Sequence, residues 1–292
     1  MYSEIAANKR KTWLIMAIFG LVIGALGWIA GNLYGGGKPY FTFLALIVGG
    51  IYALIQYFAA AKIALAVNGA KEITKKDNPR LYRTVENLSI ATGMPMPKVY
   101  IIEDQAPNAF ATGRDPKHAV VAATTGLLDI MDDTELEAVI AHEMGHVKNY
   151  DIRVMMIVFG LVSAIGFIAD MLTYSMWFRD DEDNASPLFI VLAIVAAIIA
   201  PFVAMMVRLA VSRRREYLAD STGALTTRYP EGLARALEKI RDHGSTMRRQ
   251  NSATAHLFFA NPLKGGGVAK LFSTHPPIED RITRLRQMET HL

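Results

Sequence analysis

Two histidines and a glutamate form the most informative pattern in this chain. His142, Glu143 and His146 follow the spacing H-E-x-x-H. On an α-helix, residues i and i+4 lie on one face, so both imidazoles can bind one metal ion. Glu143 projects from nearly the same side, where it can take a proton from a water that the metal activates. The pattern predicts a zinc hydrolase site. The alternative is an ordinary helix that carries two histidines.

The residues around this motif predict the helix that it requires. Asp132, followed three residues later by Glu135, fits a capping box at a helix N-terminus. Apolar residues then recur with helical spacing at Leu136, Val139, Ile140 and Val147. Upstream of the helix, residues 98–102, 108–112 and 119–124 have the composition of strands. We therefore expect a small sheet beside the helix that carries the motif.

A catalytic zinc site of this type needs a third protein ligand. The chain contains no Cys, so thiolates are excluded, and the candidates are the other histidines and the carboxylates. Glu216 and Asp220 form the best pair, because their spacing places them on one helical face. In this interpretation Glu216 binds zinc, and Asp220 accepts a hydrogen bond that orients a ligand imidazole. The alternative is a charged helix surface with local Arg–Glu pairs.

The composition points to a membrane protein. Hydrophobic residues make up 52% of the chain, and they concentrate in segments that reach the roughly 20 apolar residues needed to cross a bilayer. We expect four transmembrane helices, at about residues 13–33, 41–67, 154–178 and 188–211. The alternative for each is a buried core helix, but four such helices are too many for the rest of this chain to bury. Asp170 interrupts the third segment, and such a group usually faces the protein interior or water.

The distribution of Lys and Arg predicts the orientation in the membrane. These residues gather before the first segment, after the second and after the fourth, at residues 9–11, 71–80 and 213–215. The connection between the first two segments holds only Lys38, and the connection between the last two is mostly acidic. We therefore expect cytoplasmic termini and cytoplasmic polar regions. No basic patch interleaved with aromatic residues is present, so no nucleic-acid partner is expected.

The predicted segments divide the chain into four parts. Residues 1–67 form an N-terminal transmembrane hairpin, and residues 68–153 form a polar region with the zinc motif. Residues 154–211 form a second hairpin, and residues 212–292 form a polar region with the candidate third ligand. The two polar regions must pack together if one metal uses both. We expect an α+β fold, mainly α, with a small β-sheet and a site within roughly 12 Å of the bilayer core.

Other features suggest how a substrate is handled. An edge strand can bind an extended peptide through main-chain hydrogen bonds. The alternative is a sheet that only supports the helix. His275 lies in a Thr-His-Pro-Pro turn before a predicted helix over residues 278–285, and it could stabilise an oxyanion. Alone, such a turn usually only starts a helix. The polar, Gly-rich composition of residues 243–270 suggests a lid over the site.

Together these motifs resemble the HtpX-type membrane zinc metalloproteases, gluzincins related to the CAAX prenyl proteases. The resemblance covers nearly the whole chain, including both hairpins and the motifs at residues 108–111, 142–146, 216–220 and 273–277. It implies one zinc ion bound by His142, His146 and Glu216, with Glu143 as the general base. A specificity for prenylated C-termini is not expected, because the CAAX branch resembles a larger chamber with many spans.

The resemblance also implies a substrate site and a location. Asn108, Ala109 and Phe110 would hold the substrate backbone, and His275 would contribute to transition-state stabilisation. The location implied is the bacterial inner membrane, with the active site on the cytoplasmic side. The implied role is quality control, with misfolded membrane proteins or unfolded polypeptides as substrates and other membrane quality-control proteases as partners.

Two other classes of function remain open on the sequence. A membrane scaffold with a structural metal would bind partners without cleaving them, but it would not need Glu143. An ion or solute carrier would need a path through the membrane, for which Asp170 alone offers little. Zinc-dependent cleavage of a peptide separates the protease from both alternatives.

Overall fold

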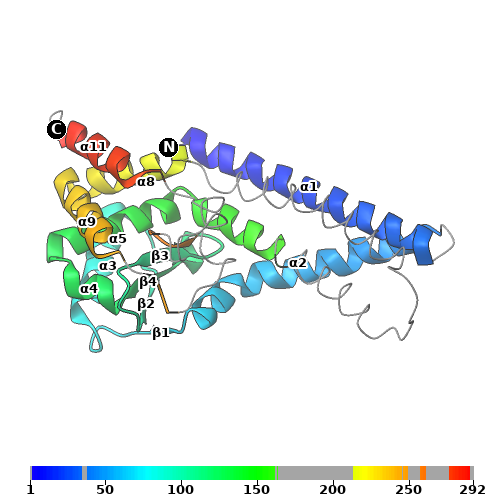
Figure 1. Cartoon of the computed structure of the whole chain (residues 1–292), viewed down its shortest axis with the longest axis horizontal. Coiled ribbons are helices and arrows are strands. Elements are labelled where there is room, and N and C mark those ends of the chain that lie inside the picture. The colour runs from blue at the N-terminus through cyan, green and yellow to red at the C-terminus, as the bar shows by residue number, and fades with distance from the viewer. Residues whose placement is uncertain are drawn as a thin grey trace. The chain divides into compact units, whose positions relative to one another are not determined.

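Figure 1 shows the computed structural model of the chain. The structure describes residues 2–34, 38–161, 163, 213–244, 246–248, 257–260 and 276–289. Most of the third and all of the fourth predicted transmembrane segment, including Asp170, lie outside these residues, as does His275. The chain divides into two compact units. The sheet unit comprises Met1–Asn8, Ala60–Met156 and Val211–Leu292, and the helix unit comprises Lys9–Ala59 and Ile157–Ala210.

Two long helices supply most of the described part of the helix unit. α1 runs over Tyr2–Tyr34 and α2 over Tyr40–Val67, so both predicted N-terminal segments are helical. Many of their large apolar side chains are exposed, among them Trp13, Leu21 and Phe43. Among the described residues, no single helix has both the length and the apolarity to cross a bilayer, but Thr42–Ile55 and Tyr57–Val67, bent by 53°, meet these criteria together. The number of spans stays a prediction.

A four-stranded sheet organises the sheet unit. Its strands are β1 (Ala70–Glu72), β2 (Lys98–Ile102), β3 (Ala109–Thr112) and β4 (Val120–Thr124). Their order is β1-β2-β4-β3, with a parallel β2–β4 pair and antiparallel pairs at both edges. The α+β class and the three predicted strands are confirmed. β1 was not predicted, because three residues are too few to show an alternation of apolar and polar side chains.

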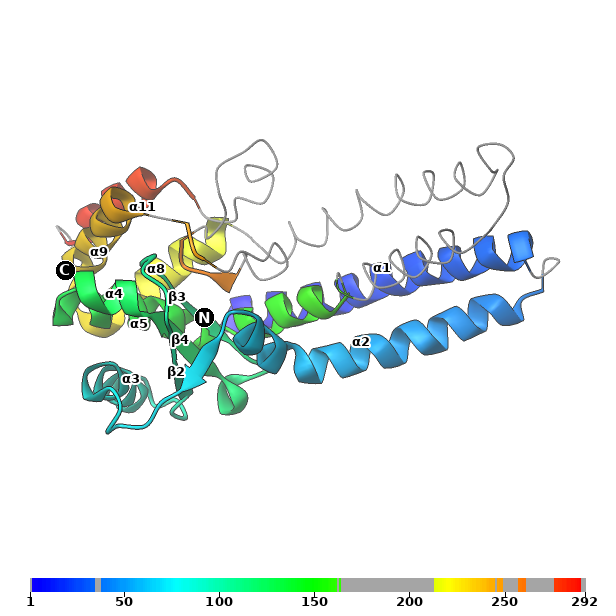
Figure 2. The ribbon, with the colours of Figure 1, turned by 60° about the horizontal axis from the view of Figure 1, so that its bottom comes forward.

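Three helices pack against this sheet: α3 (Pro79–Thr92), α4 (Thr125–Ile130) and α5 (Asp133–Lys148) (Figure 2). Behind α5 lie α8 (Arg213–Thr227), α9 (Pro230–His243) and α11 (Ile278–Glu289), and a 3₁₀ turn, η1 (Pro116–His118), precedes β4. Alternate strand residues such as Val99 and Val121 point to the core that the helices share. α5 is the central element, because it packs against α3, α8, α9 and β3.

The start of α5 is fixed by its own cap and by α9. Asp132 Oδ1 accepts a hydrogen bond from Glu135 N at 2.9 Å, and Glu135 Oε2 accepts one from Asp132 N at 2.8 Å. The predicted capping box is therefore confirmed. The Glu135 carboxylate is buried, and Lys239 Nζ of α9 lies 2.6 Å from it. Because Glu135 takes part in the capping box and also pairs with Lys239, the first turn of α5 is held to α9.

α5 and α8 cross at very short range, and a glycine of α8, Gly223, makes this possible. A Cβ atom at Gly223 of α8 would lie 2.9 Å from the backbone nitrogen of His142. On the other helix, a Cβ at Gly145 would lie 3.4 Å from the carbonyl oxygen of Ala219, which is ordinary van der Waals contact. Gly223 is therefore the position where the crossing tolerates no side chain.

We predict that Gly223→Ala destabilises the protein by about 1–3 kcal/mol, because its methyl group must push α8 away from the backbone of α5. Thermal unfolding of the detergent-purified chain, followed by circular dichroism, would show a lower midpoint. Gly145→Ala is the matched control. It fits the observed space and favours the helix, so its effect should stay within about 1 kcal/mol. Equal midpoints for Gly223→Ala and the unaltered chain would contradict the close crossing.

Candidate active site

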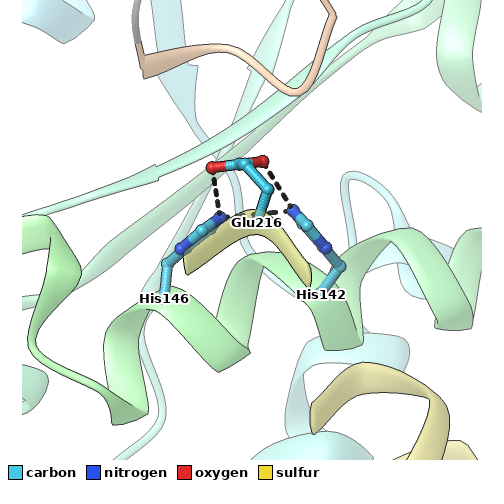
Figure 3. A group of neighbouring side chains, drawn as sticks. All are labelled: His142, His146 and Glu216. Carbon is cyan, nitrogen blue, oxygen red and sulfur yellow. Dashed lines mark hydrogen bonds and ion pairs between the residues drawn. The ribbon is translucent and has the colours of Figure 1, made fainter. Parts of the chain in front are cut away.

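The structure brings His142, His146 and Glu216 together across the α5–α8 crossing. Figure 3 shows the two imidazoles rising from successive turns of α5 toward the carboxylate of Glu216 on α8. All three side chains are buried, and one potential ligand atom from each lies within 4.8 Å of the others. The three predicted zinc ligands therefore occupy one place in the fold.

The spacing of these atoms fits a tetrahedral metal ion. The two Nε2 atoms of His142 and His146 are 3.2 Å apart. The Glu216 oxygens lie 3.8 Å from His142 Nε2 and 3.7 Å from His146 Nε2. Ligands held at about 2.1 Å from a tetrahedral ion stand roughly 3.4 Å from one another. Two imidazoles and a carboxylate are also a donor set that catalytic zinc uses, so the residues present fit the ion.

Each imidazole has a carboxylate on its other ring nitrogen. His142 Nδ1 lies 2.8 Å from Asp220 Oδ1, and His146 Nδ1 is hydrogen-bonded to Asp151 Oδ2 at 3.0 Å. Such partners turn Nε2 toward the metal and fix the ring orientation. Asp220 therefore lies where the sequence analysis placed it, on the face of α8 that also carries Glu216.

Buried guanidinium groups stand behind both carboxylates. Arg281 of α11 binds Asp220 through two hydrogen bonds, of 2.9 and 2.7 Å. Arg215 Nε of α8 lies 3.8 Å from Asp151 Oδ1. Both arginines are almost completely buried. A guanidinium that grips a carboxylate with two parallel bonds also fixes its plane, so α11 takes part in orienting His142.

The protonation of the two histidines follows from their surroundings. Burial lowers the pKa of His142 to about 4, against the opposing effect of Asp220. Burial also favours neutral His146, but the Glu216 and Asp151 carboxylates outweigh it and raise the pKa of His146 to about 9. Burial opposes ionisation of Asp220, yet Arg281 and His142 lower its pKa to about 2. The carboxylates thus attract positive charge to the place where a metal cation would be held.

Glu143 is buried between the ligand group and the edge of the sheet. Its Oε2 atom accepts a hydrogen bond from the backbone nitrogen of Ala111 in β3 at 2.8 Å. The predicted base therefore sits next to the strand that was predicted to bind substrate. A carboxylate in this position can receive a proton from a water and release it toward a peptide held along β3.

The predicted substrate-binding residues all lie at that edge. Asn108 immediately precedes β3, and Ala109 and Phe110 are its first two residues. All three are buried, and residues 257–260 of the same chain contact each of them. The role of His275 stays a prediction, since this residue lies outside the part of the chain that the structure describes.

Sequence reasoning assigned no role to Asp151, Arg281 or Phe259. Asp151 follows His146 by five residues, and a search for carboxylates near each motif histidine would have found it. Arg281 and Phe259 reach the site only through the packing of distant segments. No local spacing marks either of them.

Comparisons with known proteins agree on one family. The family model described as Peptidase family M48 matches residues 75–289. A Protease HtpX homolog of Tropheryma whipplei (strain Twist) is 56% identical, with 99% of this chain and 98% of the relative covered. A Protease HtpX homolog of Streptococcus gordonii is 42% identical and is covered completely. The crystal structure of S. mikatae Ste24p shares the fold, with a TM-score of 0.52 at 20% identity, over 98% of this chain and 67% of that one.

We predict that Glu216→Ala abolishes tight metal binding. It removes one of three protein ligands, so the affinity should fall by more than the roughly 10–100-fold that loss of an outer partner costs. Zinc content per chain, measured by mass spectrometry after dialysis against a chelator, would test this. Glu137→Ala, on α5 but outside the ligand group, should keep its zinc. Full zinc occupancy of Glu216→Ala would show that Glu216 is not a ligand.

We predict a smaller loss for Asp151→Asn. The change removes the negative charge of Asp151 beside His146 Nδ1 and keeps the shape of the Asp151 side chain. Zinc affinity should therefore fall about 10–100-fold. Competition with a chromogenic chelator would give the dissociation constant. Asp115→Asn is the control, because Asp115 also holds a histidine, His118, at 2.8 Å, but that pair is partly exposed. An unchanged zinc affinity in Asp151→Asn would remove Asp151 from the site.

Proposed function

The chain belongs to peptidase family M48 and is a metalloprotease, and on this premise we propose that it is a zinc-dependent endopeptidase of the HtpX type. The observation that carries the proposal is the group formed by His142, His146 and Glu216. The acid that would act as base, Glu143, lies on the same helix as the two histidines. A purely structural metal site would gain nothing from a carboxylate in that place.

The roles of the residues follow from their positions. When bound, zinc supplies the Lewis acidity that activates water and polarises a carbonyl group. His142, His146 and Glu216 hold the ion, and Asp220 and Asp151 keep the imidazoles in the orientation that binding requires. Glu143 receives the proton of the attacking water and passes it to the leaving amine. The hydrogen bond from Ala111 N keeps the Glu143 carboxylate in place for both transfers.

Substrate binding is assigned to the edge of β3. Strand β3 is the last in the sheet order, and a peptide that took the place of residues 257–260 could pair with its outer side. Asn108 offers an amide next to this edge, with a donor and an acceptor for a substrate backbone. His275 is proposed to stabilise the oxyanion of the transition state, a contribution that is typically worth about 100- to 1000-fold in rate.

We place this activity at the bacterial inner membrane. The exposed apolar side chains of α1 and α2 support the proposal, because soluble proteins rarely expose large contiguous apolar patches. The positive charges beside the predicted spans favour cytoplasmic termini and a cytoplasmic site. The substrates proposed are misfolded membrane proteins and unfolded polypeptides, cleaved in membrane quality control alongside other proteases.

We predict that Glu143→Gln retains zinc and loses cleavage. The glutamine keeps the shape of the side chain, and the three ligands are untouched, but it cannot accept the proton of the attacking water. Zinc-loaded, detergent-purified protein would be incubated with fluorescein-labelled casein as an unfolded substrate, and the release of fluorescent fragments would be followed.

The unaltered chain should cleave casein, and a chelator should stop it. In Glu143→Gln, turnover should fall at least about 100-fold, the lower end of what general acid–base catalysis contributes. Near-normal turnover in Glu143→Gln would contradict the assignment of the base. Cleavage that survives removal of zinc would contradict the proposed mechanism as a whole.

A further inference from the structure

The free side of β3 can be identified from its hydrogen bonds. The carbonyl of Asn108 accepts a hydrogen bond from Thr124 N of β4 at 2.9 Å, so it points into the sheet. In an antiparallel pair, successive residues alternate in direction. The N–H and C=O groups of Ala109 and Ala111 therefore point away from β4, toward the outer edge of the sheet, where a further strand would pair.

Residues 257–260 occupy this place. The Ala109 carbonyl accepts a hydrogen bond from Phe259 N at 2.8 Å. The Asn108 side chain binds the backbone of Ala260 twice: Oδ1 accepts from Ala260 N at 2.9 Å, and Nδ2 donates to Ala260 O at 2.8 Å. These are main-chain groups that any extended peptide carries, so the contacts do not depend on the side chain of residue 260.

The segment runs antiparallel to β3 in one register. Phe258 packs edge-to-face on Phe110 with ring centroids 5.0 Å apart, Phe259 pairs with Ala109, and Ala260 pairs with Asn108. Residue numbers thus rise along one strand as they fall along the other. In Figure 2 the short orange stretch of chain accordingly lies beside β3. This is the arrangement of a peptide added to a sheet edge.

Phe259 of this segment also contacts one of the predicted metal ligands, His142. Its ring lies edge-to-face on the His142 imidazole, with centroids 5.0 Å apart. The Arg281 guanidinium stands over the same ring, 4.8 Å from its centroid. The side chain is almost completely buried. A substrate cannot lie along Ala109 and reach the metal ligands while Phe259 is in this position.

We propose that residues 257–260 act as an intramolecular pseudosubstrate that covers the peptide-binding edge and must leave before a substrate can bind. This inference rests on the proposed function and adds a mechanism that regulates the access of substrates to the site. A peptide meets a site that is open for only a fraction of the time, and its apparent affinity is reduced by that fraction. This restraint requires no additional domain, because the blocking segment belongs to the sheet unit itself.

The register also indicates a substrate preference. The chain places a buried aromatic residue, Phe259, against His142 and a small residue, Ala260, beside Asn108. A substrate that replaces the segment would use the same positions. Extended segments with an aromatic residue followed by a small one should therefore bind best.

The first test weakens the segment without touching the binding edge. Ala260→Pro removes the N–H group that Asn108 Oδ1 binds and keeps the carbonyl group that Asn108 Nδ2 binds. The change is made in zinc-loaded Glu143→Gln protein, in which the side-chain amide can still accept the Ala111 N–H and no cleavage interferes. Binding of fluorescein-labelled casein is measured by fluorescence anisotropy. Ala260→Ser keeps the N–H group and is the matched control.

Ala260→Pro should tighten casein binding roughly fivefold, the effect of one lost hydrogen bond on the closed state, and Ala260→Ser should match the parent. Unchanged or weaker binding in a zinc-bound, folded Ala260→Pro protein would overturn the proposal. The outcome is separable from the proposed function. If the unaltered chain binds zinc and cleaves casein but Ala260→Pro binds no better, only the pseudosubstrate fails.

A second test does not depend on proline. The chain has no cysteine, so Ala260→Cys introduces a single thiol into the segment while keeping its backbone contacts. In the Glu143→Gln background, alkylation of this thiol should become several-fold faster when saturating casein displaces the segment. Ile90→Cys, on the exposed side of α3, should react at one rate throughout. Equal alkylation rates for Ala260→Cys with and without bound casein would overturn the proposal.

Discussion

The site depends above all on how closely α5 and α8 approach each other. The motif on α5 provides two ligands on one face, which is a purely local arrangement. The third ligand, Glu216, belongs to a segment far along the chain, and it reaches the imidazoles because Gly223 lets the backbones almost touch. A Cβ atom at that position would lie 2.9 Å from the backbone nitrogen of His142, so the two helices would have to move apart. The metal site is thus a consequence of helix packing.

The charges buried around this crossing explain why it needs a cation. Among the described residues, four buried carboxylates surround the imidazoles and two buried guanidinium groups face them, so the carboxylates outnumber the guanidinium groups by two. Uncompensated buried charge is costly. A divalent ion would cancel this charge. The same surplus of carboxylates raises the pKa of His146 to about 9.

How much of this could be predicted depends on the range of the interaction. The motif, its capping box and the strands around Val99 and Val121 are set by neighbours in sequence, and they were predicted. Glu216 was proposed from its spacing to Asp220, but the sequence could not show that it faces the motif. Arg281 and Phe259 carry no such mark, because each reaches the site through a contact with a residue more than 60 positions away, Asp220 for Arg281 and His142 for Phe259. Tertiary packing alone brings them in.

Strand β3 links the chemistry to the proposed restraint. Its outward-facing groups serve two purposes in succession: the Ala109 carbonyl binds Phe259, and the Ala111 N–H binds the base, Glu143. A peptide that displaced residues 257–260 would therefore pair with the strand that also positions the base, one residue pair away. One strand would then bind the backbone of the substrate and hold the proton acceptor. Residues 257–260 fill this edge while the Ala111 N–H still binds Glu143, so the proposed restraint acts on the access of substrate and leaves the base and the metal ligands in place.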